Sequence, residues 1–185
     1  TNQGAAFGDT TLAANHILLQ LISFSAFFLD AFAYVAESFV GRAIGAARRD
    51  LFGHAVRRTS ELAFVTAAGL ALTVALGGGL VIRALTDSAD VRAAAQAFLP
   101  WCATYVLVSV AAFQLDGVFI GATATRDMRN AALVSAGTFI AGGTLLVRQF
   151  QNHGLWLAFV GYVVVRALTL LVRYPAVRRR AAPAS

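Results

Sequence analysis

Long apolar runs dominate the chain, and short polar segments separate them. A helix needs about 20 mostly apolar residues to cross the hydrocarbon core of a bilayer. The pattern predicts five such helices, over residues 12–40, 61–85, 96–120, 131–149 and 154–173. Only the segment RQFQNH separates the last two, which predicts a tight turn between antiparallel helices. The expected fold is therefore all-α, a polytopic membrane helix bundle that occupies the whole chain, residues 1–185.

Arginines are divided unevenly between the two sets of predicted loops. Eleven lie in the segments 41–58, 121–130 and 173–180, which share one side, and three lie in the opposite loops. Cytoplasmic loops carry an excess of basic residues. We therefore expect the arginine-rich side and the C-terminus to be cytoplasmic, and the N-terminus to lie outside.

The composition supports a membrane protein and argues against several other classes. Hydrophobic residues make up 58% of the chain and charged residues only 13%, whereas a soluble domain carries about 25% charged residues. The net charge of +6 does not predict a nucleic-acid partner, because the arginines lie between apolar runs rather than on a soluble basic face. The single Cys102 excludes an internal disulfide and a cysteine-based metal cluster. We find no catalytic motif, and we expect neither an enzyme activity nor a bound cofactor or metal.

The chain opens with TNQGAAFGDT, which has neither an initiator Met nor a positively charged leader. This segment resembles a loop rather than a signal peptide. A polytopic chain that begins outside after such a loop predicts that further helices precede it.

Polar side chains recur every seven residues along the first predicted helix, at His16, Ser23, Asp30 and Glu37, with Gln20 beside them. Seven residues turn an α-helix through about 700°, so the four side chains share one slowly drifting stripe. A carboxylate at the bilayer centre costs at least about 2.5 kcal/mol. The stripe is therefore expected to face a protein interior or a water-filled cavity, and its residues are candidates for transport or cation binding.

The two acids of this stripe have different alternative explanations. Glu37 lies near the arginine-rich side, where a simple ion pair with Arg42 is an equally good account. Asp30 lies near mid-depth, and ionisable residues within a membrane are functional by default. Asp30 is therefore the better functional candidate of the two.

The third predicted helix carries a further acid, Asp116, with Gln114 close by. Both are candidates for the same role. The alternative for Asp116 is an interfacial acid that pairs with Arg126 or Arg129. Arg166, in the last predicted helix, has two possible roles: its long side chain extends to the cytoplasmic face, or it forms a salt bridge to an acid across the bundle.

Two tryptophans fall toward the predicted outer ends of their helices, at positions 101 and 156. Tryptophan is enriched where a membrane protein meets the bilayer–water interface. We therefore expect Trp101 and Trp156 to belong to an interfacial aromatic belt.

Two segments, 10–46 and 98–131, resemble the MATE (multidrug and toxin extrusion) transporters, and in particular their DinF-like bacterial branch. The phrases AFAYVAESFVGRAIGA and FQLDGVFIGAT-x-TRDMRNA carry this resemblance, which extends over essentially the whole chain. Members of the family have twelve helices in two six-helix lobes around a central cleft. The resemblance implies that this chain is a C-terminal-lobe fragment, helices eight to twelve, and that the N-terminal lobe is its missing partner.

The resemblance also implies a function. Family members exchange H⁺ or Na⁺ for cationic or amphipathic drugs, and Asp116 matches an acid of the tenth helix that contributes to a cation site in the Na⁺-coupled branch. Asp30 and Glu37 match characteristic positions of the eighth helix without an assigned role, so the coupling ion stays open. The leading interpretation is part of a secondary active multidrug efflux transporter in a bacterial inner membrane, with the lipid bilayer and a drug as partners. The alternative is a truncated, non-transporting membrane protein or an interaction scaffold.

Overall fold

Four helices make up the part of the chain that the computed structural model describes, residues 8–181. They are α2 (Asp9–Gly45), α3 (Arg49–Leu85), α4 (Ala89–Gly121) and α5 (Thr125–Arg179). Each is long and apolar enough to cross a membrane. The all-α prediction is confirmed for these residues, which contain no strand. Most of the predicted opening loop, and both ends of the predicted domain, lie outside them.

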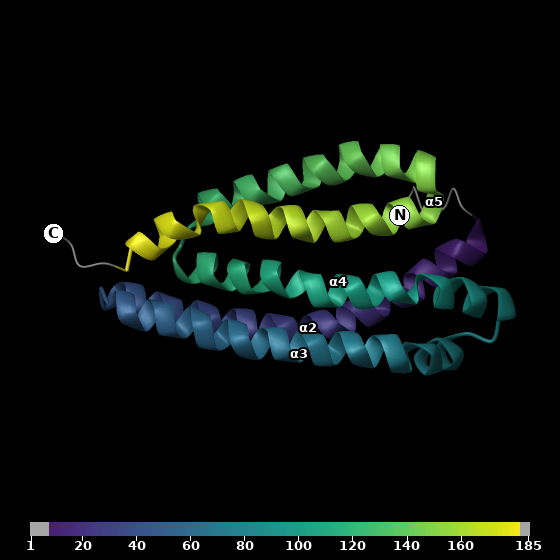
Figure 1. Ribbon diagram of the computed structural model, residues 1–185, viewed down its shortest axis with the longest axis horizontal. Coiled ribbons are helices and arrows are strands. Elements are labelled where there is room, and N and C mark those ends of the chain that lie inside the picture. Colours follow the sequence, from purple (N-terminus) through teal and green to yellow (C-terminus); the bar gives the residue numbers. More distant parts are fainter. Residues whose placement is uncertain (1–7, 182–185) are drawn as a thin grey trace.

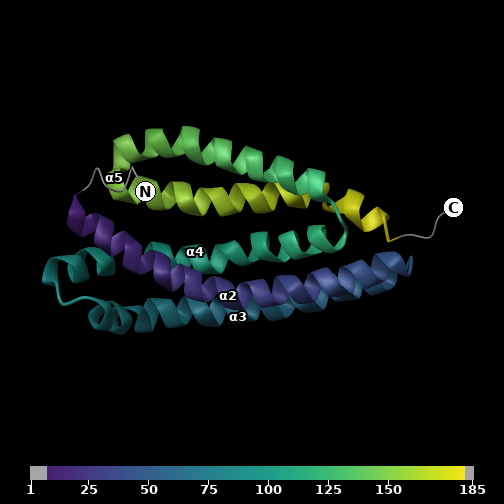
Figure 2. The ribbon, with the colours of Figure 1, turned by 180° about the vertical axis from the view of Figure 1, so that it is seen from behind.

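The five separate helices expected from the sequence are not observed as such, because α5 contains both of the last two predicted spans. Its backbone is non-helical at Gln151, with φ 51° and ψ −130°. Figures 1 and 2 show that the chain reverses there, so that the two arms of α5 lie side by side. A glycine allows the arms to approach closely, since a Cβ at Gly154 would collide with the backbone of Leu146 and Val147.

The turns after α2 and α4 are built alike and lie at the same end of the bundle (Figure 1). Each includes one residue in the left-handed region, Ala47 at φ 50° and Thr123 at φ 53°. In both turns, a backbone N–H beyond the helix end donates to a carbonyl five residues earlier at 2.9 Å. This is the Schellman arrangement, which satisfies the free carbonyl groups at a helix end. Two of the predicted arginine-rich loops are therefore short turns at one end of the bundle.

α4 is the central helix, and it packs against α2, α3 and α5. Its buried residues contribute to two large apolar clusters, one toward each end of the bundle. The most deeply buried large side chains are Leu18, Phe52, Ile82, Phe119 and Leu170. This central position brings the middle of α4 against both α2 and the second arm of α5.

The outer face of α3 is apolar and exposed. Leu62, Val65, Leu72, Leu76 and Leu80 lie along it, and each is at least 59% exposed. A continuous apolar surface of this kind is unfavourable in water. It suits a helix that contacts the hydrocarbon chains of a membrane.

The expected surface position of Trp156 is wrong, because this side chain is only 3% exposed. Its Nε1 donates to Asn15 Oδ1 at 3.0 Å, and the amides of Asn15 and Asn152 exchange hydrogen bonds at 2.7 and 3.1 Å. The network ties the α5 hairpin to α2. Trp101 is half-buried, and its Nε1 donates to His153 Nδ1 at 3.0 Å.

Candidate functional site

Three of the acids singled out in the sequence line one cavity of about 270 Å³ between α2, α4 and α5. Asp30 and Glu37 come from α2, two turns apart, and Asp116 comes from α4. Arg166, from the second arm of α5, lies in the same wall. The other lining residues are Ala33, Tyr34, Phe113, Gly117, Ile120 and Met128.

A close contact between the backbones of α2 and α4 brings the acids together. A Cβ at Gly117 would collide with the backbone of Ala33, and a Cβ at Gly121 would collide with that of Glu37. Two small residues four positions apart form the motif by which helices approach closely in membranes. The contact places Asp116, next to Gly117, level with the acids of α2. The spacing of Gly117 and Gly121 is the sequence signal of this motif, which the expectations from the sequence did not include.

Asp116 and Arg166 form a bidentate ion pair across the bundle. Arg166 Nε donates to Asp116 Oδ2 at 2.9 Å, and Nη2 donates to Oδ1 at 2.8 Å. The side chains are 24% and 16% exposed respectively. Of the two roles considered for Arg166, the salt bridge is therefore confirmed, and the extension to the membrane surface is wrong. Neither Arg126 nor Arg129 pairs with Asp116 in the described part of the chain.

Asp30 and Glu37 form no ion pair within residues 8–181. The predicted pairing of Glu37 with Arg42 is not formed, because the Arg42 guanidinium lies over the ring of Phe39, 4.6 Å from its centroid. The cavity therefore has three carboxyl groups and one guanidinium group in its lining. The described residues contain no group of three or more His, Cys, Asp or Glu that could together hold a metal ion.

The other three candidates lie outside this cavity. Gln20 is exposed and is hydrogen bonded to His16 at 3.1 Å, and Ser23 is also exposed. Gln114 is buried against α3, where its amide nitrogen donates to Thr59 Oγ1. Its Oε1 is buried without a hydrogen-bond partner among the described residues. The polar stripe of α2 thus has two parts. Its C-terminal half, with Asp30 and Glu37, lines the acid-rich cavity, and its N-terminal half, with His16, Gln20 and Ser23, lies on an open face.

Comparison with known proteins gives a family for this arrangement. A sequence model of the family described as MatE matches residues 4–145. DNA damage-inducible protein F of Escherichia coli (strain K12) is 34% identical to the chain over 167 residues, which are 90% of this chain and 36% of that protein. The chain thus spans little more than a third of the length of this relative. The three acids of the cavity lie within the region that the family model matches, whereas Arg166 lies beyond it.

Proposed function

Because the chain belongs to the MatE family, we propose that it is part of a secondary active multidrug efflux transporter, which exchanges H⁺ or Na⁺ for cationic or amphipathic drugs. Members of this family are transporters and not enzymes. The observation that carries the proposal is the acid-rich cavity, which lies among helices long and apolar enough to cross a membrane. The scaffold alternative explains none of these intramembrane acids.

The described helices then form most of one six-helix lobe, with the two arms of α5 as separate spans. The lobe lies in a bacterial inner membrane with its arginine-rich end in the cytoplasm, and an N-terminal lobe completes the central cleft. This arrangement is supported by three exposed polar residues in the N-terminal half of α2: His16, Gln20 and Ser23. Polar groups are costly against lipid, so a partner lobe or a watery cleft is the better neighbour for that face.

Asp30 and Glu37 take up the coupling ion in this proposal. The charge of Asp116 is already balanced by Arg166, whereas the other two carboxyl groups have no ion-pair partner in the described chain. Removing an unpaired carboxylate from water costs several kcal/mol, and a proton or a bound cation offsets that cost. A cationic drug competes for the same charge. In alternating access, one helix bundle rocks against the other between an inward-open and an outward-open state. Exchange follows if the protein's affinities for the ion and for the drug differ between these two states.

The test of the site is Asp30→Asn in the complete natural protein, expressed in bacteria that lack their own drug efflux pumps. We expect slower efflux of the cationic dye ethidium at unchanged abundance in the membrane. The matched control is Asp9→Asn, which removes an exposed acid from the same helix, at its far end, and should leave efflux unchanged. Normal efflux by the Asp30 variant would assign this residue to structure alone.

The coupling ion is tested separately in proteoliposomes that contain the natural protein. A pH gradient or a Na⁺ gradient is imposed in turn, and ethidium movement is measured. Movement driven by one gradient identifies the ion. Failure of both gradients would contradict the transporter proposal and favour the scaffold.

A further inference from the structure

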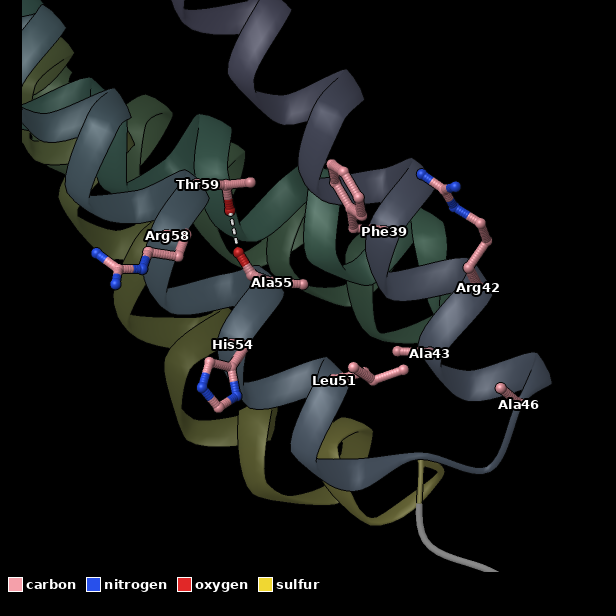
Figure 3. Close-up of a pocket in the computed structure, with 9 residues that line it drawn as sticks. All are labelled: Phe39, Arg42, Ala43, Ala46, Leu51, His54, Ala55, Arg58 and Thr59. Carbon is pink, nitrogen blue, oxygen red and sulfur yellow. Dashed lines mark hydrogen bonds between the residues drawn. The ribbon is translucent and has the colours of Figure 1, made fainter.

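A basic groove of about 530 Å³ lies between α2 and α3, next to the turn that joins them (Figure 3). Figure 3 shows Phe39 and Leu51 between the two helices, with Arg42 on the α2 rim and His54 and Arg58 on the α3 rim. No acidic residue lines it. The groove shares no residue with the acid-rich cavity, and the proposed transport mechanism does not use it.

The positive charge of this groove is only partly balanced by the protein. Arg42 forms no ion pair within the described residues. Arg58 donates one hydrogen bond, from Nη1 to Glu61 at 3.2 Å, which leaves most of its five N–H donors free. Asp50, the other acid close to the turn, is held by Arg48. Two exposed guanidinium groups therefore remain available to an anion.

Each arginine stands at the end of an exposed apolar strip. Phe39, 47% exposed, precedes Arg42 by three positions and lies on the same face of α2. Leu62 and Val65, 60% and 72% exposed, follow Arg58 by four and seven positions on α3. The groove thus combines cationic groups with apolar surface that runs along both helices toward the interior of the membrane.

We propose that this groove binds an anionic phospholipid. Arg42 and Arg58, at the two rims, attract its phosphate, and its acyl chains lie along the exposed faces of α2 and α3. Basic pockets between membrane helices suit anionic headgroups, and a guanidinium group can donate two parallel hydrogen bonds to a phosphate. An apolar helix from elsewhere in the natural protein fits less well, because it would bury two arginines against hydrocarbon.

The test is native mass spectrometry of the complete natural protein, purified in detergent with equal amounts of phosphatidylglycerol and phosphatidylcholine. An arginine near an anionic membrane surface is worth about a fivefold preference, so two predict a preference of about 25-fold for phosphatidylglycerol. We expect Arg42→Gln/Arg58→Gln to lose this preference. The matched control is Arg126→Gln/Arg129→Gln, which removes the same charge from the other turn at this end and should retain it.

A second variant separates a shaped site from general charge attraction. Ala46→Phe keeps every charge but places a ring in the groove, which Ala46 lines, so it should also reduce retention of phosphatidylglycerol. Three results would overturn the proposal: equal retention of the two lipids by the unmodified protein, equal loss in the control variant, or full retention by Ala46→Phe. Absence of any bound phosphatidylglycerol on the unmodified protein would overturn it as well. None of these readouts depends on transport, so the lipid site and the proposed function can fail independently.

Discussion

Removing the guanidinium of Arg166 should destabilise the protein more than removing both members of its ion pair. In Arg166→Gln, the Asp116 carboxylate keeps its position but loses both charge-assisted hydrogen bonds, in a cavity that already contains two other acids. Breaking a buried pair costs about 3–5 kcal/mol, whereas an exposed pair is worth about 0–1 kcal/mol. The side chains are 16% and 24% exposed, which places this pair nearer the buried limit, at about 2–3 kcal/mol.

The double variant Arg166→Gln/Asp116→Asn should recover most of this loss, because neither charge is then left without a partner. Together with the unmodified protein and Asp116→Asn, these two variants form a double-mutant cycle, measured by tryptophan fluorescence during unfolding of the complete natural protein in detergent. The matched control is Arg48→Gln. It breaks the bidentate pair with Asp50, in which the two side chains are 58% and 55% exposed, and it should cost much less than Arg166→Gln.

Two outcomes would refute this reasoning. If Arg166→Gln costs no more than Arg48→Gln, the ion pair in the cavity behaves as an exposed pair. If the double variant is as unstable as Arg166→Gln, the loss comes from packing of the arginine side chain, which also covers apolar surface. In either case, the charge balance assigned to the cavity would have to be abandoned.

Three further predictions use the same unfolding and efflux assays. Gly117→Ala should destabilise the protein by about 1–3 kcal/mol because its methyl group meets the backbone of α2. Gly69→Ala, whose methyl group would meet no atom within 4 Å, should be neutral or slightly stabilising, and equal effects of the two would contradict the close contact. Asn152→Ala should cost about 1–3 kcal/mol, since it leaves the amide of Asn15 buried without that partner; an unfolding midpoint that does not change would show that the network is not needed. Gln114→Leu should leave ethidium efflux unchanged because this residue lies outside the acid-rich cavity, and lost efflux at normal abundance would restore it as a transport residue.

The helices were predictable because the free energy of placing a helix in a membrane depends on its own composition. The apolar runs therefore located all the long helices, and the polar turn before residue 154 located the hairpin of α5. The sequence did not indicate how the turns are made. Ala47 and Thr123 adopt left-handed conformations that usually favour glycine. Because neither residue is a glycine, the sequence gave no signal that a helix ends at these positions.

The site was less predictable because it depends on contacts between distant segments. The seven-residue spacing correctly placed Asp30 and Glu37 on one face of α2, since that relation is local. The partner of Asp116 lies 50 positions away in Arg166, and only the packing of α4 against the second arm of α5 selects it over nearer arginines. Trp156 was misplaced for a similar reason: the interfacial preference of tryptophan is an average, and a buried acceptor on Asn15 overrides it.

The structure also separates the three acids as candidates for ion binding. The family resemblance singled out Asp116, but its carboxylate oxygens already accept two hydrogen bonds from Arg166, so a cation would first have to displace that guanidinium. Asp30 and Glu37 need no such displacement. If they bind the ion, Asp30→Asn should change the dependence of efflux on ion concentration without large loss of stability. Asp116→Asn should do the reverse, because it leaves Arg166 without its partner. The same loss of ion dependence in both variants would instead mean that Asp116 binds the ion directly and that Arg166 moves away during transport.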